Sequence, residues 1–356
     1  MSDRRERSAV RWMEGALLVV LGLAGCTSSC SRPVALAEVP RELQGTAPET
    51  AVTLLPLGGP LQSDAAELSG LAWYGDHLIM LPQYPDWQGG GVSCLYTVSK
   101  ADILARLDHT ASGALEPRCI PFDGAGHEKR IQGFEGYEAI EFAGDQAYLT
   151  VETVSGSTGT GIIVTGRIAP DLSGLKLEAS PMASIPLPVD VSNAGFETLV
   201  VGEDRVLALY EANGALVNPG AAAESFDRAL TPSRKLPLPP IEYRITDATS
   251  MDEEGRFWVI NYNYPGSQKH FKPAPDPFMA RYGTGPTHAR KPEVERLIEL
   301  QVKADGIVLT GRPPLQLQLI EGTGRNWEGL VRLDDRGFLM VTDKFPKTLL
   351  GFVPGP

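Results

Sequence analysis

Apolar and polar residues alternate in short runs along most of this 356-residue chain, and one run pattern returns five times. Each copy has a small or acidic start, an alternating apolar run, a turn of Gly or Asp, and a second apolar run that ends at a polar residue. The copies are residues 68–85, 136–154, 195–214, 246–266 and 326–346. Two apolar runs joined by a short turn are typical of a β-hairpin, so the sequence predicts five hairpins.

The polar residues that open and close each copy are regularly spaced. Four pairs lie 14 residues apart, and the fifth lies 15 apart because its turn is longer. The pairs are Ser69/Gln83, Glu138/Glu152, Glu197/Glu211, Asp247/Asn261 and Glu328/Asp343. We therefore predict an all-β fold, a five-bladed β-propeller, with six blades as the alternative. A β-sandwich or an up-and-down barrel would explain the strands but not the repeated polar positions.

Residues 51–356 supply the strands of this predicted propeller domain. The runs at 294–300 and 315–320 would be the outer strands of the fourth blade, and residues 51–59 would close the ring beside the last blade. Residues 101–107, ADILARL, are the best short helix candidate. Long apolar helices are not predicted for this domain.

The N-terminus has the pattern of a secretion signal. A basic segment is followed by the apolar run 15–25, and the residues Leu23-Ala24-Gly25-Cys26 resemble the lipobox of bacterial lipoproteins. We therefore predict a lipoprotein signal peptide at 1–25, with Cys26 as the lipidated residue, and a flexible tether at 26–50. A plain secretory signal is the alternative. The expected location is the cell envelope, with the domain anchored to a bacterial membrane by lipid.

Charge and cysteine content narrow the partners. The chain has 32 basic and 44 acidic residues, a net charge of −12, so we expect no nucleic-acid partner and favour cations or cationic ligands. In an oxidising envelope, Cys94 and Cys119, which lie on two strand-like runs, are candidates for a disulfide, with two buried thiols as the alternative. The domain is expected to be a monomer.

The last copy, NWEGLVRLDDRGFLMVTDKFP (326–346), resembles the C-terminal motif of the phytase-like esterase propellers. Residues 133–140 and 247–260 resemble the internal motifs of that family more loosely. The resemblance implies a secreted or lipid-anchored propeller that binds calcium and hydrolyses esters or phosphoesters. Ser69 and Thr198 depart from the acidic and glycine positions of the pattern.

The repeated polar residues define the candidate site. The first strand of each blade lines the central channel of a propeller, so we expect the starts and ends of the hairpins to meet at one channel mouth. Converging carboxylates repel one another unless a cation or protonation neutralises them, and oxygen ligands suit Ca²⁺. The predicted Ca²⁺ ligands are Glu138, Glu197, Asp247, Asn261 and Glu328, and the candidate catalytic residues are Glu152, Glu211 and Asp343. Glu135 competes with Glu138 for its position.

Two functions remain open from the sequence. The first is a calcium-assisted hydrolase that acts on a small or phosphorylated substrate at the channel mouth. The second is a propeller without catalysis that binds a ligand or protein on the cell surface. The chain has no Gly-x-Ser-x-Gly motif, so it offers no α/β-hydrolase nucleophile.

Overall fold

The computed structural model describes residues 45–356 apart from residues 156–157 and 322–323. The predicted signal peptide, Cys26 and most of the predicted tether lie outside the described residues. Strands dominate the described part, in which no helix is long and apolar enough to cross a membrane. Its four short α-helices are α1 (Lys100–Leu107), α2 (His127–Arg130), α3 (Gln268–Phe271) and α4 (Pro277–Tyr282). Helix α1 is the predicted helix, and the Ser99 side chain caps its N-terminus.

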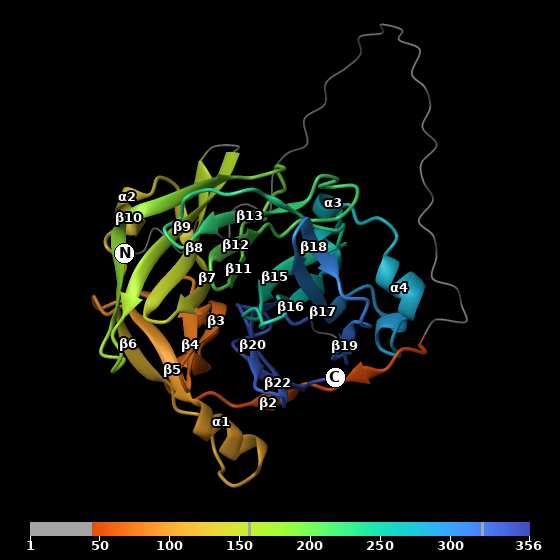
Figure 1. Cartoon of the computed structure of the whole chain (residues 1–356). Helices are drawn as coiled ribbons and strands as arrows, with labels where there is room; N and C mark the ends of the chain where they lie inside the picture. Colours follow the sequence, from red (N-terminus) through yellow and green to blue (C-terminus); the bar gives the residue numbers. More distant parts are fainter. Residues whose placement is uncertain (1–44, 156–157, 322–323) are drawn as a thin grey trace, which may run out of the picture. The chain divides into compact units, whose positions relative to one another are not determined.

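The strands run in successive antiparallel meanders (Figure 1). The first meander is β3 (Leu68–Tyr74), β4 (His77–Pro82), β5 (Cys94–Ser99) and β6 (Arg118–Asp123). The second is β7 (Phe134–Ala143), β8 (Gln146–Ser155), β9 (Thr158–Ile168) and β10 (Leu175–Pro186). The third is β11 (Thr198–Val201), β12 (Arg205–Leu209), β13 (Ala222–Asp227) and β14 (Leu236–Pro237). Strands β6 and β10 also pair in parallel, which joins the outer edges of the first two meanders.

The last two meanders use strands from both ends of the described chain. The fourth is β15 (Arg244–Ala248), β16 (Arg256–Asn263) and β17 (Val294–Lys303), followed by β18 (Gly306–Leu309) and β19 (Leu315–Leu317), with β1 (Glu49–Thr50) on β19. The fifth is β20 (Trp327–Leu333), β21 (Gly337–Thr342) and β22 (Leu350–Pro354), completed by β2 (Thr53–Leu55). The run at 51–59 therefore closes the ring beside the last meander, as predicted.

The first strands of the five meanders form a ring. Strands β3, β7, β11, β15 and β20 contact one another in this order, and β20 returns to β3. Five apolar cores lie between successive meanders in the same cyclic order, each made of buried residues from two neighbours. Because every sheet is covered on both faces, its strands are apolar over most of their length. The predicted all-β propeller class is confirmed.

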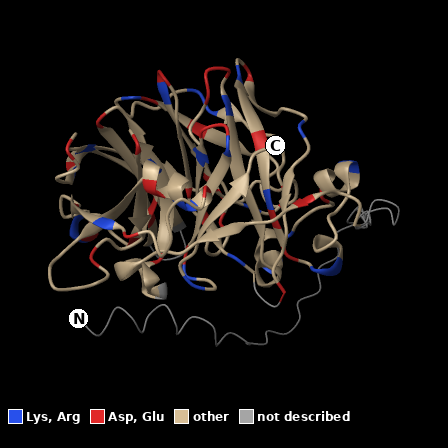
Figure 2. Cartoon of the chain, turned by 90° about the horizontal axis from the view of Figure 1, so that it is seen from below, with Lys and Arg blue, Asp and Glu red and all other residues tan. Residues whose placement is uncertain are grey.

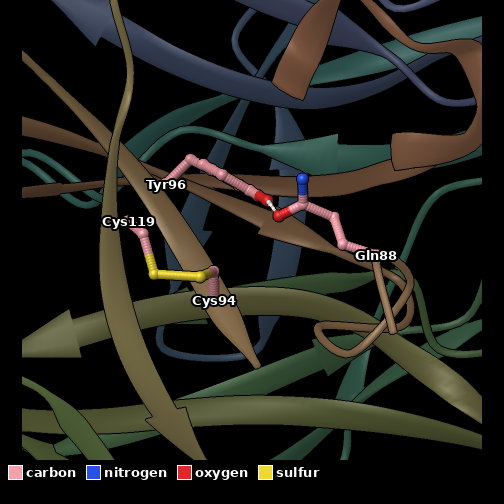
Figure 3. The surroundings of a disulfide bond; sticks show 4 residues. All are labelled: Gln88, Cys94, Tyr96 and Cys119. Atoms are coloured by element: carbon pink, nitrogen blue, oxygen red, sulfur yellow. Dashed lines mark hydrogen bonds between the residues drawn. A yellow bond between two sulfur atoms is a disulfide. The ribbon is translucent and has the colours of Figure 1, made fainter. Parts of the chain in front are cut away.

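A disulfide joins the first residue of β5 to β6 (Figure 3). It links Cys94 to Cys119 within the first meander, at a sequence separation of 25. Beside it, the hydroxyl of Tyr96 donates a hydrogen bond to Oε1 of Gln88 over 2.7 Å. The disulfide joins the two outer strands of this sheet. The hydrogen bond ties Gln88, in the glycine-rich loop that precedes β5, to β5 itself.

Candidate active site

The candidate residues on the inner strands lie at β-bulges. The pairing of β3 with β4 shifts register at Ser69, and that of β20 with β21 shifts at Glu328. The pairing of β7 with β8 shifts twice, at Glu135 and at Glu138. A bulge inserts one residue into a strand and redirects its side chain, and bulges are frequent beside active sites. The polar positions that recur in the sequence thus coincide with β-bulges that recur in the inner strands.

In the fourth meander, the repeated polar position lies one residue earlier than the sequence predicted. Ser69 Oγ donates to the carbonyl of Tyr137 in the next meander over 2.7 Å, and Thr246 Oγ1 donates to the carbonyl of Trp327 over 2.6 Å. Thr246 rather than Asp247 therefore occupies the repeated position, because both hydroxyls form the same bond to the neighbouring inner strand. The carboxylate of Asp247 is buried and accepts from the Leu330 amide over 2.7 Å.

Asn261, a predicted ligand, has its amide group engaged within the fold. Its Nδ2 donates to the carbonyls of Glu242 and Arg244 over 2.8 and 3.0 Å, and its Oδ1 accepts from Arg296 Nε over 2.8 Å. The side chain is fully buried. Asn261 and Asp247 thus hold strands together, and we remove both from the ligand set.

The other predicted carboxylates converge, and we call them the acidic cluster. Its members come from the second, third and fifth meanders and are Glu138, Glu152, Glu197, Glu328 and Asp343. Burial is the main cause that raises their pKa values. The negative charge of other members adds to it for the four glutamates, and the charge of Glu67 adds to it for Asp343. Figure 2 shows acidic positions among the central strands as well as at the outer turns.

The sizes of these shifts separate the members of the cluster. Burial raises the pKa values of Glu152 and Glu197 to about 7 and that of Asp343 to about 6. The pKa values of Glu138 and Glu328 lie well above the usual 4.5, because burial and several neighbouring carboxylates act together. Glu152, Glu197 and Asp343 therefore change protonation state near neutral pH.

Arg244, at the start of β15, is a cation beside the acidic cluster. Its Nε donates to Oε1 of Glu211, which is fully buried, and its NH2 lies 3.6 Å from Oε1 of Glu197. The same NH2 donates to the carbonyl of Asn193 over 3.1 Å. Glu211, which the sequence placed among catalytic candidates, therefore orients Arg244. The charge of Arg244 lowers the pKa values of Glu152, Glu197 and Glu328 against the effect of burial.

Two amide side chains orient members of the cluster. Gln83 Nε2 donates to Oε1 of Glu138 over 2.7 Å, and Asn326 Nδ2 donates to Oε1 of Glu328. Glu135 is exposed, whereas Glu138 is buried and belongs to the cluster, which settles their competition for the channel position. Gln83 extends the site to the first meander.

The sequence reasoning missed Arg244 and the role of Asn326. Arg244 lies in IEYRITDAT, two residues before Thr246 of the fourth copy, where the register was displaced by one. A basic residue beside otherwise acidic or small repeat positions is a signal that could have identified it. Asn326 was visible as the start of the most specific motif, but it had no assigned partner.

The cluster has the donor chemistry of a calcium site without a finished coordination sphere. Oε2 of Glu197 and Oε2 of Glu211 are buried and have no hydrogen-bond partner. Within the described residues, no three His, Cys, Asp or Glu side chains stand in position to hold a metal ion. The oxygen donors fit a hard cation, and its binding would have to draw the carboxylates closer together.

Two open hollows lie away from the cluster, on the outer strands of the first and second meanders. Their volumes are about 640 and 510 Å³, and both are lined by Asp123, Arg167 and Lys176. None of the predicted site residues lines either hollow. The acidic cluster thus stands as the candidate active site on its charge and its convergence.

No family model and no curated protein sequence matches this chain. Solved structures with a similar chain path include the catalytic domain of a Coprinopsis cinerea GH62 α-L-arabinofuranosidase, with 7% identity, a TM-score of 0.45, and coverage of 86% of this chain and 97% of that one. An exo-1,5-α-L-arabinanase from a bovine ruminal metagenomic library has 9% identity, a TM-score of 0.44, and coverage of 86% and 94%. A Cellvibrio cellulosa α-L-arabinanase has 9% identity, a TM-score of 0.42, and coverage of 81% and 90%. These likenesses are distant and assign no activity.

Proposed function

We propose that the chain is a hydrolase of ester or phosphoester bonds, that the acidic cluster is its active site, and that Ca²⁺ is its metal. The proposal is supported by one observation above all: five buried carboxylates come from three meanders, and Arg244, the cation that acts on three of them, is already paired with Glu211. Such a cluster is under-neutralised, and either protons or a cation can compensate its charge. The resemblance of residues 326–343 to phytase-like esterases motivates the choice of bond.

The roles follow from burial and bonding. Glu138, Glu197 and Glu328 are the proposed ligands, because two of them are oriented by amide side chains and Glu197 has an unpartnered oxygen. When bound, Ca²⁺ would polarise a carbonyl or phosphoryl oxygen. Glu152 and Asp343 are the proposed proton-transfer residues, since pKa values of about 7 and 6 let each accept a proton from water and return it near neutral pH.

The direct test is an activity assay of the purified chain. Phytate and p-nitrophenyl esters would be supplied in EDTA and in millimolar Ca²⁺, for the wild type, Glu328→Gln and Glu152→Gln. We expect Ca²⁺-dependent release of phosphate or p-nitrophenol that falls at least tenfold in both variants. Glu203→Gln, which changes an exposed turn residue, should retain wild-type activity. Equal rates in all four proteins would contradict the site assignment.

We also propose that the protein is held at the cell envelope by a lipid on Cys26. The lipobox-like residues 23–26 support this proposal. Replacement of Cys26 by Ser should abolish membrane retention and leave unprocessed precursor, which detergent partitioning and mass spectrometry would detect. A wild-type protein that is soluble and carries an unmodified Cys26 would refute it.

A propeller that binds without catalysis is the second candidate. It is favoured by the absence, in the part of the chain that the structure describes, of a hydroxyl or thiol nucleophile hydrogen-bonded to any member of the acidic cluster. In that case Ca²⁺ would stabilise the protein, but no ester or phosphoester would be cleaved under any metal condition. The assay above separates the two candidates when it is combined with melting curves.

A further inference from the structure

A buried carboxylate of the fourth meander is bonded to both chain neighbours of Asn326. Oε1 of Glu295, on β17, accepts a hydrogen bond from the Arg325 amide over 3.1 Å, and Oε2 accepts from Arg325 Nε over 2.9 Å. Oε2 also accepts from Nε1 of Trp327 over 2.8 Å. Because Asn326 stands between these two residues in the chain, Glu295 holds the segment on both sides of it.

These bonds are closed off from water. The side chain of Glu295 is 0% exposed and that of Arg325 is 2% exposed, and Trp327 is fully buried. Arg325 is held a second time, since its NH2 lies 2.8 Å from Oε2 of Glu295 and donates to the carbonyl of Gln318 over 2.7 Å. Both oxygens of Glu295 therefore face only donors, a pattern that an ionised carboxylate satisfies and a neutral amide does not.

The backbone of Glu295 is anchored as well. Its N–H donates to Nε2 of His288 over 3.2 Å, so the proton of the neutral imidazole lies on Nδ1. That Nδ1 donates to Oε1 of Glu49 over 2.8 Å. Burial lowers the pKa of His288, which keeps the ring neutral. The position of Glu295 is thus fixed independently of its bonds to the fifth meander.

Asn326 in turn contacts two members of the acidic cluster. Its Nδ2 donates to Oε1 of Glu328, and a hydrogen bond from its side chain lowers the pKa of Asp343. The backbone is paired too, because the Asp343 amide donates to the Asn326 carbonyl over 3.0 Å. The Asn326 amide donates to the carbonyl of Phe345 over the same distance. One asparagine therefore joins a carboxylate of β20 to the carboxylate that follows β21.

We propose that Glu295 is a positioning residue of the acidic cluster. Through its bonds to the two chain neighbours of Asn326, it holds that side-chain amide on Glu328 and Asp343. A hydrogen bond to the charged form of a carboxyl group favours that form, so the placement of the amide helps to set the charge of the cluster. The effect on catalysis rests on the proposed hydrolase function, whereas the placement of the amide does not.

Nuclear magnetic resonance of the purified chain, labelled with ¹⁵N only at asparagine, tests this placement without any cleavage step. The chain has six asparagines, so the side-chain signals of Asn326 are identified by their loss in Asn326→Ala. In the wild type these signals should shift between about pH 5 and about pH 9, because carboxyl groups bonded to the amide lose their protons as the pH rises. In Glu295→Gln this pH-dependent shift should shrink at least twofold.

Two further variants separate positioning from a general loss of stability. Glu299, also buried on β17, is the matched control, because among the described residues its carboxylate bonds Arg312 Nε over 3.1 Å and none of residues 325–327. Glu299→Gln should leave the Asn326 shift unchanged. Arg325→Lys keeps the charge but loses the planar fork, so it should also reduce the shift, and it serves if Glu295→Gln does not fold.

Two results would overturn the positioning role. The first is a wild type whose Asn326 signals stay fixed over this pH range, since the amide would then not lie on titrating carboxyl groups. The second is an undiminished shift in folded Glu295→Gln and Arg325→Lys proteins, which would leave Glu295 with a structural role alone.

The outcomes also distinguish this inference from the proposed function. With p-nitrophenyl esters and Ca²⁺, Glu295→Gln should be at least fivefold slower than wild type, whereas Glu299→Gln should keep the wild-type rate. A wild type that cleaves no ester, but whose Asn326 shift depends on Glu295, would retain the positioning role and refute the hydrolase. An active wild type with an undiminished shift in Glu295→Gln would retain the hydrolase and refute the positioning role.

Discussion

Arg244 and Glu211 form a buried ion pair between the third and fourth meanders, beside Glu197 of the acidic cluster. The glutamate is fully buried, so it has no solvent to compensate its charge if the guanidinium is removed. The pair therefore both joins two meanders and places a positive charge beside the remaining carboxylates. Loss of Arg244 would therefore change both the packing of the two meanders and the net charge of the site.

Removal of Arg244 alone should be more harmful than removal of the pair. Breaking a buried ion pair typically costs about 3–5 kcal/mol, because it leaves an uncompensated charge, whereas replacing both partners by apolar residues costs much less. We expect Arg244→Leu to lower the free energy of unfolding in urea by an amount in this range at pH 7. The double variant with Glu211→Leu should recover part of the loss. A double variant no more stable than Arg244→Leu would contradict the pairing.

Glu141 should make the protein less stable as the pH rises. This carboxyl group is buried on β7 and accepts a hydrogen bond from Ser250 Oγ over 2.7 Å. Burial raises its pKa from 4.5 to about 7, so the folded state binds the proton more tightly than the unfolded state. Its stabilising contribution is complete below about pH 4.5 and is lost as the pH rises through 7.

The variant Glu141→Gln removes this loss, because the amide stays neutral. At pH 8 it should be more stable than wild type by roughly 3 kcal/mol, and at pH 4.5 the two should have similar free energies of unfolding. Urea titrations at several pH values between 4.5 and 8 measure the difference. Glu203→Gln, at an exposed turn, is the matched control and should follow wild type. A pH-independent difference would show that Glu141 does not titrate in this range.

The disulfide should contribute through the unfolded chain. It closes a loop with a sequence separation of 25 residues, and a crosslink of this size typically stabilises a domain by about 2–4 kcal/mol. The double variant Cys94→Ala/Cys119→Ala should therefore unfold at lower urea concentration. Dithiothreitol should shift the wild-type midpoint in the same direction and leave the double variant unchanged. Coincident wild-type curves with and without reductant would contradict a stabilising disulfide.

The fold was largely predictable from the sequence, because the same hairpin recurs and its turns are short. The closing strand at 53–55 was predictable for a related reason: a ring of meanders leaves one edge of the last sheet to be filled, and an apolar run precedes the first copy. The pairing of β6 with β10 and the placement of β1 on β19 were not predictable. They depend on contacts between outer strands, which have no repeated pattern.

The site was only partly predictable, for physical reasons visible at single residues. Spacing identifies that a polar residue recurs, but a β-bulge decides which of two neighbours takes the repeated position, as Thr246 and Asp247 show. Spacing also cannot tell a free side chain from one that bonds its own fold, which is the case of Asn261. Arg244 was missed because it does not recur in the other copies of the hairpin. Only the folded structure shows that its guanidinium lies beside Glu197 and Glu211.

Calcium should stabilise the folded chain if the acidic cluster binds it. A ligand at 100 times its dissociation constant that binds only the folded state adds about 2.7 kcal/mol, which for a domain of this size raises the melting temperature by several degrees. Melting curves in EDTA and in millimolar Ca²⁺ measure the shift. Glu328→Gln should reduce it, because the variant removes one charge and keeps the shape, and Glu203→Gln should not change it.

Arg244→Gln should change this calcium effect in the opposite direction. Loss of the guanidinium leaves the cluster more negative, so the apo protein should melt at a lower temperature, while the shift caused by Ca²⁺ should grow. The opposite signs for Glu328→Gln and Arg244→Gln are expected only if the metal lies close enough to feel both charges. If the curves in EDTA and Ca²⁺ superimpose for the wild type and for Arg244→Gln, the cluster holds no tight Ca²⁺ site. Its charge would then be balanced by protons or by an organic cation.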